Sequence, residues 1–319
     1  MYNTTKPYTS KIMELMEQTW ETRYCSVRKV GSYPIIRKYM LSQEIIHTDG
    51  IGTKGAYHWA NRSFKDAVKD AMAMNLNDLL MVKAHPYAMQ NHIFLPEDDH
   101  KAIEEIVYEM AIMCKTHEVA MTGGETSIHD NMEGMEISIT MSGIIPDDAI
   151  SFKNRVKEND YIIGYESSGL HSNGFSRIRK FLPVDKIKHD KNALNILCSP
   201  TIDYSKKSNC YSSFVNGIMH ITGGAYTKLK GILPLDLDIV IDGMNKIGER
   251  NKRLFEKVYN NVKNEDEMYK TFNCGIGLIL SVSNIELLKN DGFTLLGRVQ
   301  KGTGKIQIDS QFSKSRIEL

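Results

Sequence analysis

The sequence predicts an α/β protein of two domains, each with a mixed sheet and covering helices. Segments with strand character alternate with segments of helical periodicity along most of the chain, the pattern expected of α/β and α+β folds. The chain has 319 residues, more than the about 250–300 residues at which a single hydrophobic core stops growing. Its glycines gather just after the predicted strands, where a backbone must turn or approach a ligand closely.

The first half predicts strands and helices from β-branched runs, apolar spacing and turn residues. The helix at 102–113 follows an acidic capping run, and the helix at 64–83 ends before a proline. These elements are, in order, a strand at 43–48, helices at 64–83 and 102–113, and strands at 119–122 and 135–145, the last two joined by a loop with glycines and an acid.

The second half repeats this alternation after a polar, turn-rich stretch at 146–160. We place a domain boundary there, which predicts domains at 1–150 and 151–319. The predicted elements are a strand at 161–164, helices at 175–182, 205–219 and 249–262, and strands at 238–241, 277–282 and 294–299.

The composition excludes several classes of protein. Lys and Arg number 40 against 39 Asp and Glu, a net charge of +1, which argues against a nucleic-acid or membrane-surface binder. No apolar stretch reaches the about 18 residues of a membrane span, and the N-terminus does not read as a signal peptide. Five widely spaced cysteines indicate reduced thiols rather than a disulfide framework or zinc site. We expect a cytoplasmic protein.

The glycine loop at 49–55 is a candidate anion site. Backbone amides in such turns form concavities that bind anions, and Thr53 and Lys54 add a hydroxyl and an ammonium. The Gly-x-x-x-x-Gly-Lys-Ser/Thr pattern of a P-loop does not occur there. An ordinary strand–helix turn is an equally good interpretation of this loop taken alone.

Three carboxylates accompany the glycine loops and favour a metal–nucleotide site. Asp49 stands at a strand end, Asp78 follows Asn77 late in an otherwise apolar helix, and Glu125 follows Gly123 and Gly124. Mg²⁺ in proteins prefers one or two carboxylates together with phosphate oxygens. The alternative is that each carboxylate pairs with a lysine or caps a turn.

A second candidate site precedes the helix at 175–182. Ser172, Asn173 and Gly174 are ordinary helix-capping residues. Together with the imidazole of His171 they also suit a phosphate or amide substrate. The segment 220–224 has the same two interpretations.

These loops, in this order, resemble phosphoribosylformylglycinamidine cyclo-ligase, also called aminoimidazole ribonucleotide synthetase, of purine biosynthesis. The motifs at 47–54 and 123–126 are shared with thiamine-monophosphate kinase and selenophosphate synthetase. Two other motifs are far more specific to the cyclo-ligase: His-Ser-Asn-Gly at 171–174 and Met-Tyr-Lys-Thr-Phe-Asn-Cys-Gly at 268–275. The other matching segments are Asn77-Asp78, Ser199-Pro200-Thr201 and 220–224.

The resemblance implies a homodimer whose N-terminal domains join strands into a shared barrel, with ATP and Mg²⁺ bound near that interface. It implies an N-terminal domain for ATP and dimerisation and a C-terminal domain for a small phosphorylated substrate, with neither nucleic acid nor membrane as partner. The implied ATP-binding residues are Asp49, Gly50, Gly52, Thr53, Lys54, Asn77, Gly123, Gly124, Glu125 and Thr126, with Asp49, Asp78 and Glu125 as metal ligands. The implied substrate-binding residues are Ser168, His171, Ser172, Asn173, Gly174, Thr222, Gly223 and Gly224.

The implied reaction is ATP-dependent closure of formylglycinamidine ribonucleotide to aminoimidazole ribonucleotide. Asp49, Lys54, Asp78, Glu125 and His171 are the catalytic candidates, and Asp70, Glu125 and His171 are candidates for a general base. Three segments depart from the family pattern, at 29–37, 83–86 and 127–131. The alternatives are another ATP-dependent enzyme of the superfamily with a different substrate, and a catalytically weak homologue that serves as a binding or scaffold subunit.

Overall fold

The structure, a computed structural model, describes residues 9–30, 33–39, 43–145, 156–288 and 291–319. Its contacts divide the chain into two compact units. The first unit comprises Met1–Leu79, Ala84–Ile150 and Val184–Asp203, and the second comprises Leu80–Lys83, Ser151–Pro183 and Tyr204–Leu319. Because Val184–Asp203 returns to the first unit, a single boundary near residue 150 does not describe the whole division. Most of the predicted linker, 146–155, lies outside the described residues.

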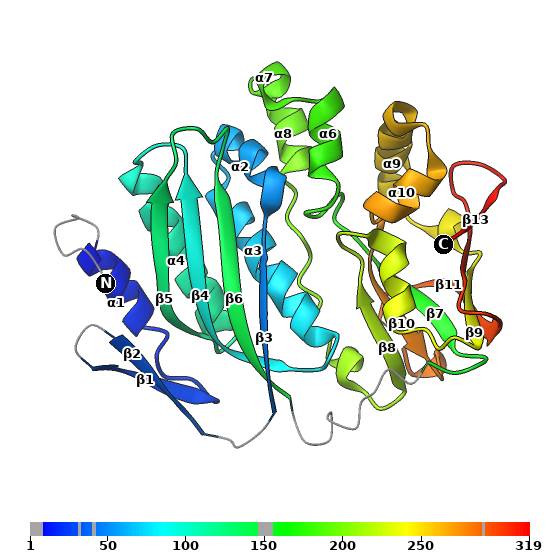
Figure 1. The fold of residues 1–319 in the computed structure, drawn as a ribbon, viewed down its shortest axis with the longest axis horizontal. Helices are drawn as coiled ribbons and strands as arrows, with labels where there is room; N and C mark the ends of the chain where they lie inside the picture. The colour runs from blue at the N-terminus through cyan, green and yellow to red at the C-terminus, as the bar shows by residue number, and fades with distance from the viewer. Residues whose placement is uncertain (1–8, 31–32, 40–42, 146–155, 289–290) are drawn as a thin grey trace. The chain divides into compact units, whose positions relative to one another are not determined.

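The first unit combines a hairpin, a four-stranded sheet and several helices (Figure 1). Its strands are β1 (Cys25–Val30), β2 (Tyr33–Lys38), β3 (Gln43–Gly50), β4 (His85–Leu95), β5 (Ala120–Ile128) and β6 (Glu136–Ile145). Its helices are α1 (Thr9–Glu17), η1 (Gly52–Lys54), α2 (Gly55–Asn61), α3 (Phe64–Leu80), α4 (His100–Thr116), α7 (Val184–Ile187) and α8 (Lys191–Leu197).

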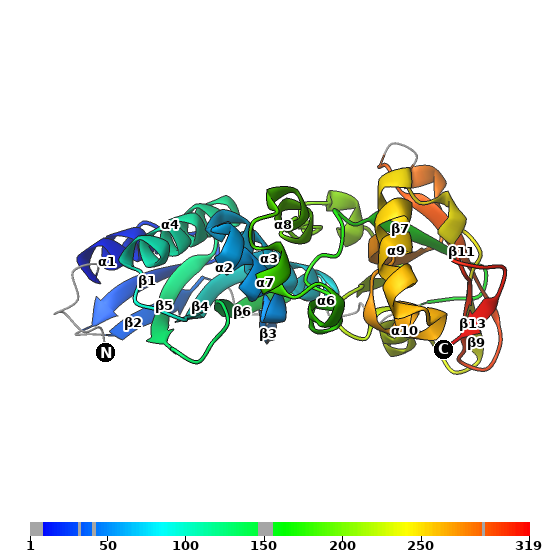
Figure 2. The same ribbon diagram turned by 90° about the horizontal axis from the view of Figure 1, so that it is seen from above.

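The four-stranded sheet has the order β3-β6-β4-β5, with only β4 and β5 parallel. Helices α3 and α4 cover one face of it, as Figure 2 shows from above. Side chains alternate between the two faces along each strand, so Ile137, Ile139 and Met141 are buried toward the helices. The opposite face carries more polar residues, and on it Ile46 is 65% exposed.

Capping and the spacing of apolar residues explain why the two long helices of this unit form. α4 begins where the Asp99 carboxylate accepts a hydrogen bond from the Ala102 amide, an N-cap that satisfies one of the helix's free donors. Its buried residues recur every three or four positions, which gives one apolar face. α3 is buried along most of its length because it lies directly on the sheet.

The second unit contains a seven-stranded sheet of order β13-β12-β9-β11-β7-β10-β8, in which only β12 and β9 are parallel. Its strands are β7 (Tyr161–Glu166), β8 (Val215–His220), β9 (Leu237–Ile241), β10 (Ile276–Val282), β11 (Thr294–Lys301), β12 (Ile306–Asp309) and β13 (Arg316–Glu318). Its helices are α6 (Phe175–Phe181), η2 (Ser208–Tyr211), η3 (Ala225–Gly231), η4 (Met244–Lys246), α9 (Glu249–Val262), α10 (Glu265–Thr271) and η5 (Glu286–Leu288).

Helices α9 and α10 pack against each other in this unit. α9 buries Asn251, Phe255, Val258 and Val262, a stripe at helical spacing. The Asn264 side chain caps α10 by accepting a hydrogen bond from the Glu267 amide, and acidic residues fill the first turn, where the helix dipole favours them.

Most predicted elements are confirmed with shifted ends, but the helix predicted at 205–219 is wrong. That stretch forms the short helix η2 and then strand β8, whose six residues are all buried. A short apolar run bounded by turn residues fits a buried strand as well as a helix. The predicted end of a strand at Thr122 is also wrong, because β5 continues through Gly123 and Gly124.

The five cysteines are free and buried, in agreement with the predicted reduced thiols. In the described residues, no helix is long and apolar enough to cross a bilayer.

Candidate functional site

The glycine loop that follows β3 presents its amides to carboxylates. The Gly50 amide donates to Asp49 Oδ1 over 2.7 Å, and the Gly52 amide donates to Glu136 Oε1 over 3.0 Å. Gly52 has a φ of +55°, a conformation that favours glycine. The loop then enters η1 and α2 without a gap. Its amides therefore bind anionic oxygens already within the protein itself, as an anion-binding turn does.

Glu136 is a member of this loop's surroundings that the sequence analysis missed. It opens β6, and burial raises the pKa of its carboxyl, with the nearby Asp49 charge acting in the same direction. Amide donation from the loop opposes that shift. No motif marks Glu136 in the sequence. Only the pairing of Gly50 with Ser138, two residues along β6, brings it to the loop.

Side-chain contacts connect β3 to α3 through His47, Asn75 and Asp78. His47 Nδ1 lies 3.1 Å from Asn75 Oδ1, and its Nε2 lies 3.2 Å from Asp78 Oδ2. The hydrogen bond with Asp78 raises the pKa of His47, against the effect of burial. Asn75 also donates to the backbone oxygen of Asp49 over 3.2 Å. His47 and Asp49 are two positions apart in β3, so their side chains lie on the same face of the sheet. Because His47 contacts Asp78 of α3, Asp49 and Asp78 lie on the same, helix-facing side.

Glu125 lies elsewhere in the first unit. It is exposed on β5, the edge strand opposite β3, so about three strand spacings, ~14 Å, separate it from Asp49 along the sheet. Glu125 pairs with His92, and His92 pairs with Ser138. This register also places Glu125 on the face of the sheet opposite to Asp49. In the described residues, no group of three or more His, Cys, Asp or Glu side chains could hold a metal ion. The predicted set Asp49, Asp78 and Glu125 is therefore not gathered within one chain.

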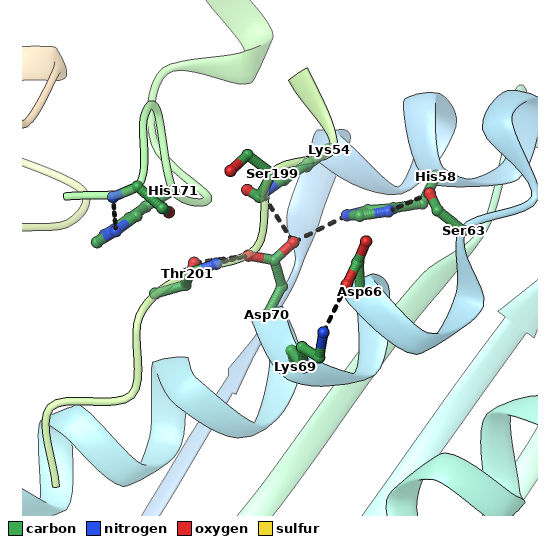
Figure 3. Close-up of polar contacts among 10 residues, drawn as sticks. Lys54, His58, Ser63, Asp66, Lys69, Asp70, His171, Ser199 and Thr201 are labelled. Carbon is green, nitrogen blue, oxygen red and sulfur yellow. Dashed lines mark hydrogen bonds and ion pairs between the residues drawn. The ribbon is translucent and has the colours of Figure 1, made fainter. Parts of the chain in front are cut away.

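Lys54 and Asp70 form an ion pair in the interior of the first unit (Figure 3). Lys54 Nζ lies 2.7 Å from Asp70 Oδ2, and both side chains are 0% exposed. Lys54 also donates to the backbone oxygen of Ser199 over 2.7 Å. The phosphate contact predicted for Lys54 remains untested, but its ammonium is turned inward in this structure.

Asp70 contacts three other residues of this cluster, namely Lys54, His58 and Thr201. Its Oδ1 accepts hydrogen bonds from the Thr201 amide and hydroxyl, at 2.7 and 2.6 Å, and its Oδ2 lies 2.8 Å from His58 Nε2. Burial alone would raise the pKa of the Asp70 carboxyl, but the Lys54 charge and the His58 hydrogen bond hold it well below its usual range. Burial lowers the pKa of His58, whose Nδ1 is 2.8 Å from Ser63 Oγ.

The segment 199–203 is thereby fixed to the helices of the first unit. Asn77 Nδ2 donates to the Ile202 oxygen over 2.8 Å, and Asp203 Oδ2 lies 3.1 Å from His117 Nε2 at the end of α4. Asn77, predicted in the ATP site, is 0% exposed and has this structural contact. The signal for the segment was the Ser199-Pro200-Thr201 motif, whose partners the sequence could not name.

In the second unit, three loops meet at one end of the sheet. The carboxyl ends of β7 and β8 flank the amino end of β10, since Ile276 pairs with Glu166 and Leu278 pairs with His220. Asn273 connects two of these loops: its Oδ1 accepts from the Ser167 hydroxyl and the Gly275 amide, and its Nδ2 donates to the Gly169 oxygen, at 3.2, 2.9 and 3.0 Å.

The predicted substrate segments 171–174 and 222–224 lie together in this group of loops. Asn173 Nδ2 donates to the Ile221 oxygen over 3.1 Å, which joins the two segments directly. The Ser168 amide donates to His171 Nε2 over 3.2 Å, and His171 has a φ of +55°. Gly223 and Gly224 are exposed, and Lys228 donates to the Thr222 hydroxyl over 2.7 Å.

Both halves of the chain match family models. Residues 39–145 match the AIR synthase related protein, N-terminal domain, and residues 157–307 match its C-terminal domain. A phosphoribosylformylglycinamidine cyclo-ligase from Saccharolobus solfataricus is 32% identical over 312 residues, covering 93% of this chain and 90% of the relative. One from Bacillus pumilus is 34% identical over 280 residues, covering 81% and 80%.

Solved structures share the fold at lower identity. The hydrogenase maturation protein HypE in complex with ATP superposes with a TM-score of 0.66 at 16% identity, covering 100% of this chain and 96% of that chain. A thiamine-monophosphate kinase from Stenotrophomonas maltophilia gives 0.64 at 15%, covering 98% and 99%. These likenesses establish a two-unit mixed α/β fold with mixed sheets.

Proposed function

We propose that this chain, which belongs to the phosphoribosylformylglycinamidine cyclo-ligase family, closes formylglycinamidine ribonucleotide to aminoimidazole ribonucleotide with ATP, releasing ADP and phosphate. The observation that carries the proposal is the likeness to named cyclo-ligases through both units of the chain. The ATP complex of the fold neighbour HypE supports ATP as the co-substrate.

ATP phosphates belong, in this proposal, at the amides of Gly50, Gly52 and Thr53. The amides of Gly50 and Gly52 already donate to carboxylate oxygens, which supports an anion at this loop. Asp49 and Asp78 share one side of the sheet and suit Mg²⁺, which needs only one or two carboxylates besides phosphate oxygens. When bound, Mg²⁺ supplies charge neutralisation for phosphoryl transfer. The remaining residues proposed for the ATP site are Asn77, Gly123, Gly124, Glu125 and Thr126 of the first unit.

Glu125 would reach the same nucleotide only from a second copy of the chain, because it lies at the far edge of the sheet from Asp49. We therefore propose a homodimer in which the first units join their sheets into a shared barrel.

The phosphorylated substrate belongs at the loop group of the second unit. Ser168, His171, Ser172, Asn173 and Gly174 lie on one loop, and Thr222, Gly223 and Gly224 lie on its neighbour. Their amides, hydroxyls and amide side chains suit phosphate and amide groups. His171 is the candidate here for moving a proton during ring closure.

The chemistry is activation of an oxygen as a leaving group. The formyl oxygen of the substrate attacks the γ-phosphorus of ATP, and ADP leaves. The amidine nitrogen then attacks the activated carbon, the ring closes, and the oxygen departs with phosphate while the nitrogen loses a proton. Positioning and charge neutralisation supply most of the rate in such transfers.

Purified protein with formylglycinamidine ribonucleotide, ATP and Mg²⁺ tests the proposal. Ring formation in step with ADP release supports it. ATP turnover only with a different acceptor would make the chain another enzyme of the superfamily. Absence of ATP binding would leave a binding or scaffold subunit and would refute both enzymatic functions.

A further inference from the structure

We propose that Lys54 and Asp70 act as one positioning unit for the glycine loop, and that the Lys54 ammonium does not itself bind phosphate. The inference rests on the proposed function, because that function assigns the ATP phosphates to this loop. It changes the role expected for Lys54 from the sequence. It also gives Asp70, a candidate general base from the sequence, a positioning role instead.

The Lys54–Asp70 pair is fully buried in the first unit. Both side chains are 0% exposed, and Nζ lies 2.7 Å from Oδ2. A lysine that binds phosphate needs an accessible ammonium, and withdrawing this one would leave the Asp70 carboxylate buried without its cation. Breaking a buried pair in that way is strongly unfavourable.

The Lys54–Asp70 pair is neutral as a unit. The Asp70 carboxylate cancels the Lys54 charge at contact distance, so the pair presents no net charge to an anion. Among the described contacts of Asp70, burial lowers the pKa of His58 and so favours its neutral form, and Thr201 contributes an amide and a hydroxyl. In this proposal the backbone amides of the loop, and not the Lys54 ammonium, attract the phosphates.

The cluster connects two segments of the first unit to α3. Asp70 lies in the middle of α3, and Figure 3 shows it pointing toward Lys54, His58 and Thr201. Lys54 is the last residue of η1, directly after the glycine loop, and it also donates to the Ser199 oxygen. One carboxylate thus ties the glycine loop and the segment 199–201 to the same turn of one helix.

A second contact fixes the loop from its other side. The backbone of Gly55 packs so closely on residue 135 that a Cβ at Gly55 would lie 1.7 Å from the Met135 oxygen. The chain after Lys54 therefore cannot shift toward β6. The ion pair at Lys54 and this close packing at Gly55 both hold the end of the glycine loop in place.

A double-mutant cycle of Lys54→Met and Asp70→Asn tests the unit, with urea unfolding and Mg·ATP affinity as readouts. Each single change should raise the unfolding equilibrium constant by about 100-fold or more, because it leaves a buried charge without its ion-pair partner. The double change should cost at least about tenfold less than the product of the two. ATP affinity should fall in each single variant and fall no further in the double.

The proposal is overturned if Lys54→Met weakens ATP binding by the same factor in the wild-type and Asp70→Asn backgrounds. Independent effects of that kind mean that the ammonium contacts phosphate directly. Unfolding constants that simply multiply, with no coupling, would overturn it too.

Hydrogen exchange separates this inference from the proposed function. The Gly55 amide donates to the Gly52 oxygen and reports on the loop, and the Ile103 amide in α4 serves as a control. If the wild-type protein binds no ATP, the proposed function fails, yet faster exchange at Gly55 and unchanged exchange at Ile103 in Asp70→Asn still support positioning. Unchanged exchange at Gly55 overturns it.

Thr201 provides a milder pair of variants should the buried charges prevent folding. Thr201→Val removes the hydroxyl that donates to Asp70, and Thr201→Ser retains it. We expect Thr201→Val to raise KM for ATP by about threefold to tenfold with little change in kcat, and Thr201→Ser to restore KM. Equal KM values in both variants would contradict the positioning role.

Discussion

His58 Nε2 lies 2.8 Å from Asp70 Oδ2, and neither side chain is exposed to solvent. The same carboxylate oxygen lies 2.7 Å from Lys54 Nζ, so it already has a full positive charge beside it. A protonated His58 would add a second buried cation. Burial accordingly lowers the pKa of His58 and keeps its folded form neutral near pH 7.

We predict that acid destabilises the first unit in two stages. A group with a depressed folded pKa contributes stability above its unfolded pKa, and that stability is lost as the pH falls. For His58 the loss begins near the unfolded value of about 6.5. For Asp70 it begins near about 4. Each group contributes at most about 1.4 kcal/mol per pH unit within its window.

Urea unfolding between pH 7.5 and 5 measures the first stage. His58→Gln should flatten the decline in free energy of unfolding over that range. His189→Gln, at an exposed position of the same unit, is the matched control and should leave the slope unchanged. An identical slope in wild type and His58→Gln would refute the neutral buried imidazole.

Asp49→Asn should abolish ring closure and leave the fold intact. The change removes a proposed Mg²⁺ ligand, while the contact from the Gly50 amide can persist to the new amide oxygen. Turnover and thermal unfolding of the variant measure the two effects. Near-normal turnover would contradict the metal-binding role of Asp49.

Gly174→Ala should destabilise the second unit by about 1–3 kcal/mol, because it combines backbone strain with a steric clash. Gly174 has a φ of +71°, and a Cβ there would lie 2.2 Å from the Phe272 ring. Gly223→Ala is the control, since a Cβ at Gly223 meets nothing within 4 Å. Thermal unfolding distinguishes them, and equal melting temperatures would count against this packing.

Glu136→Gln should tighten ATP binding by about threefold to tenfold. The Glu136 carboxylate occupies the Gly52 amide that the phosphates are proposed to use, and it repels them. Titration calorimetry with Mg·ATP measures the change. Weaker binding in the variant would instead make Glu136 a partner of the metal.

The sequence predicted several helices and strands correctly and missed others of both kinds. α4 and α9 have capped or amphipathic patterns that local rules describe, and their bounds differ little from those predicted. β4 was not predicted, because Pro86 and a mixture of polar residues conceal its place in the sheet between β5 and β6. β8 was taken for a helix because a strand buried on both faces loses its alternation.

The candidate site was predictable where local periodicity places residues together. Asp49 at the end of β3 and Asp78 late in α3 belong to two elements that are close in sequence. The contacts of Asp70 with Thr201, 131 positions away, depend on the return of Val184–Asp203 to the first unit. No local pattern encodes that return, so the sequence suggested neither the burial of Lys54 nor its partner.

The proposed reaction depends on activation of the formyl oxygen of the substrate by ATP. Formylglycinamidine ribonucleotide labelled with ¹⁸O at the formyl group, incubated with the protein, ATP and Mg²⁺, tests it in one measurement of the released phosphate. We expect one aminoimidazole ribonucleotide for each ADP, with the label in the phosphate. Unlabelled phosphate, or ADP released without ring formation, would contradict it.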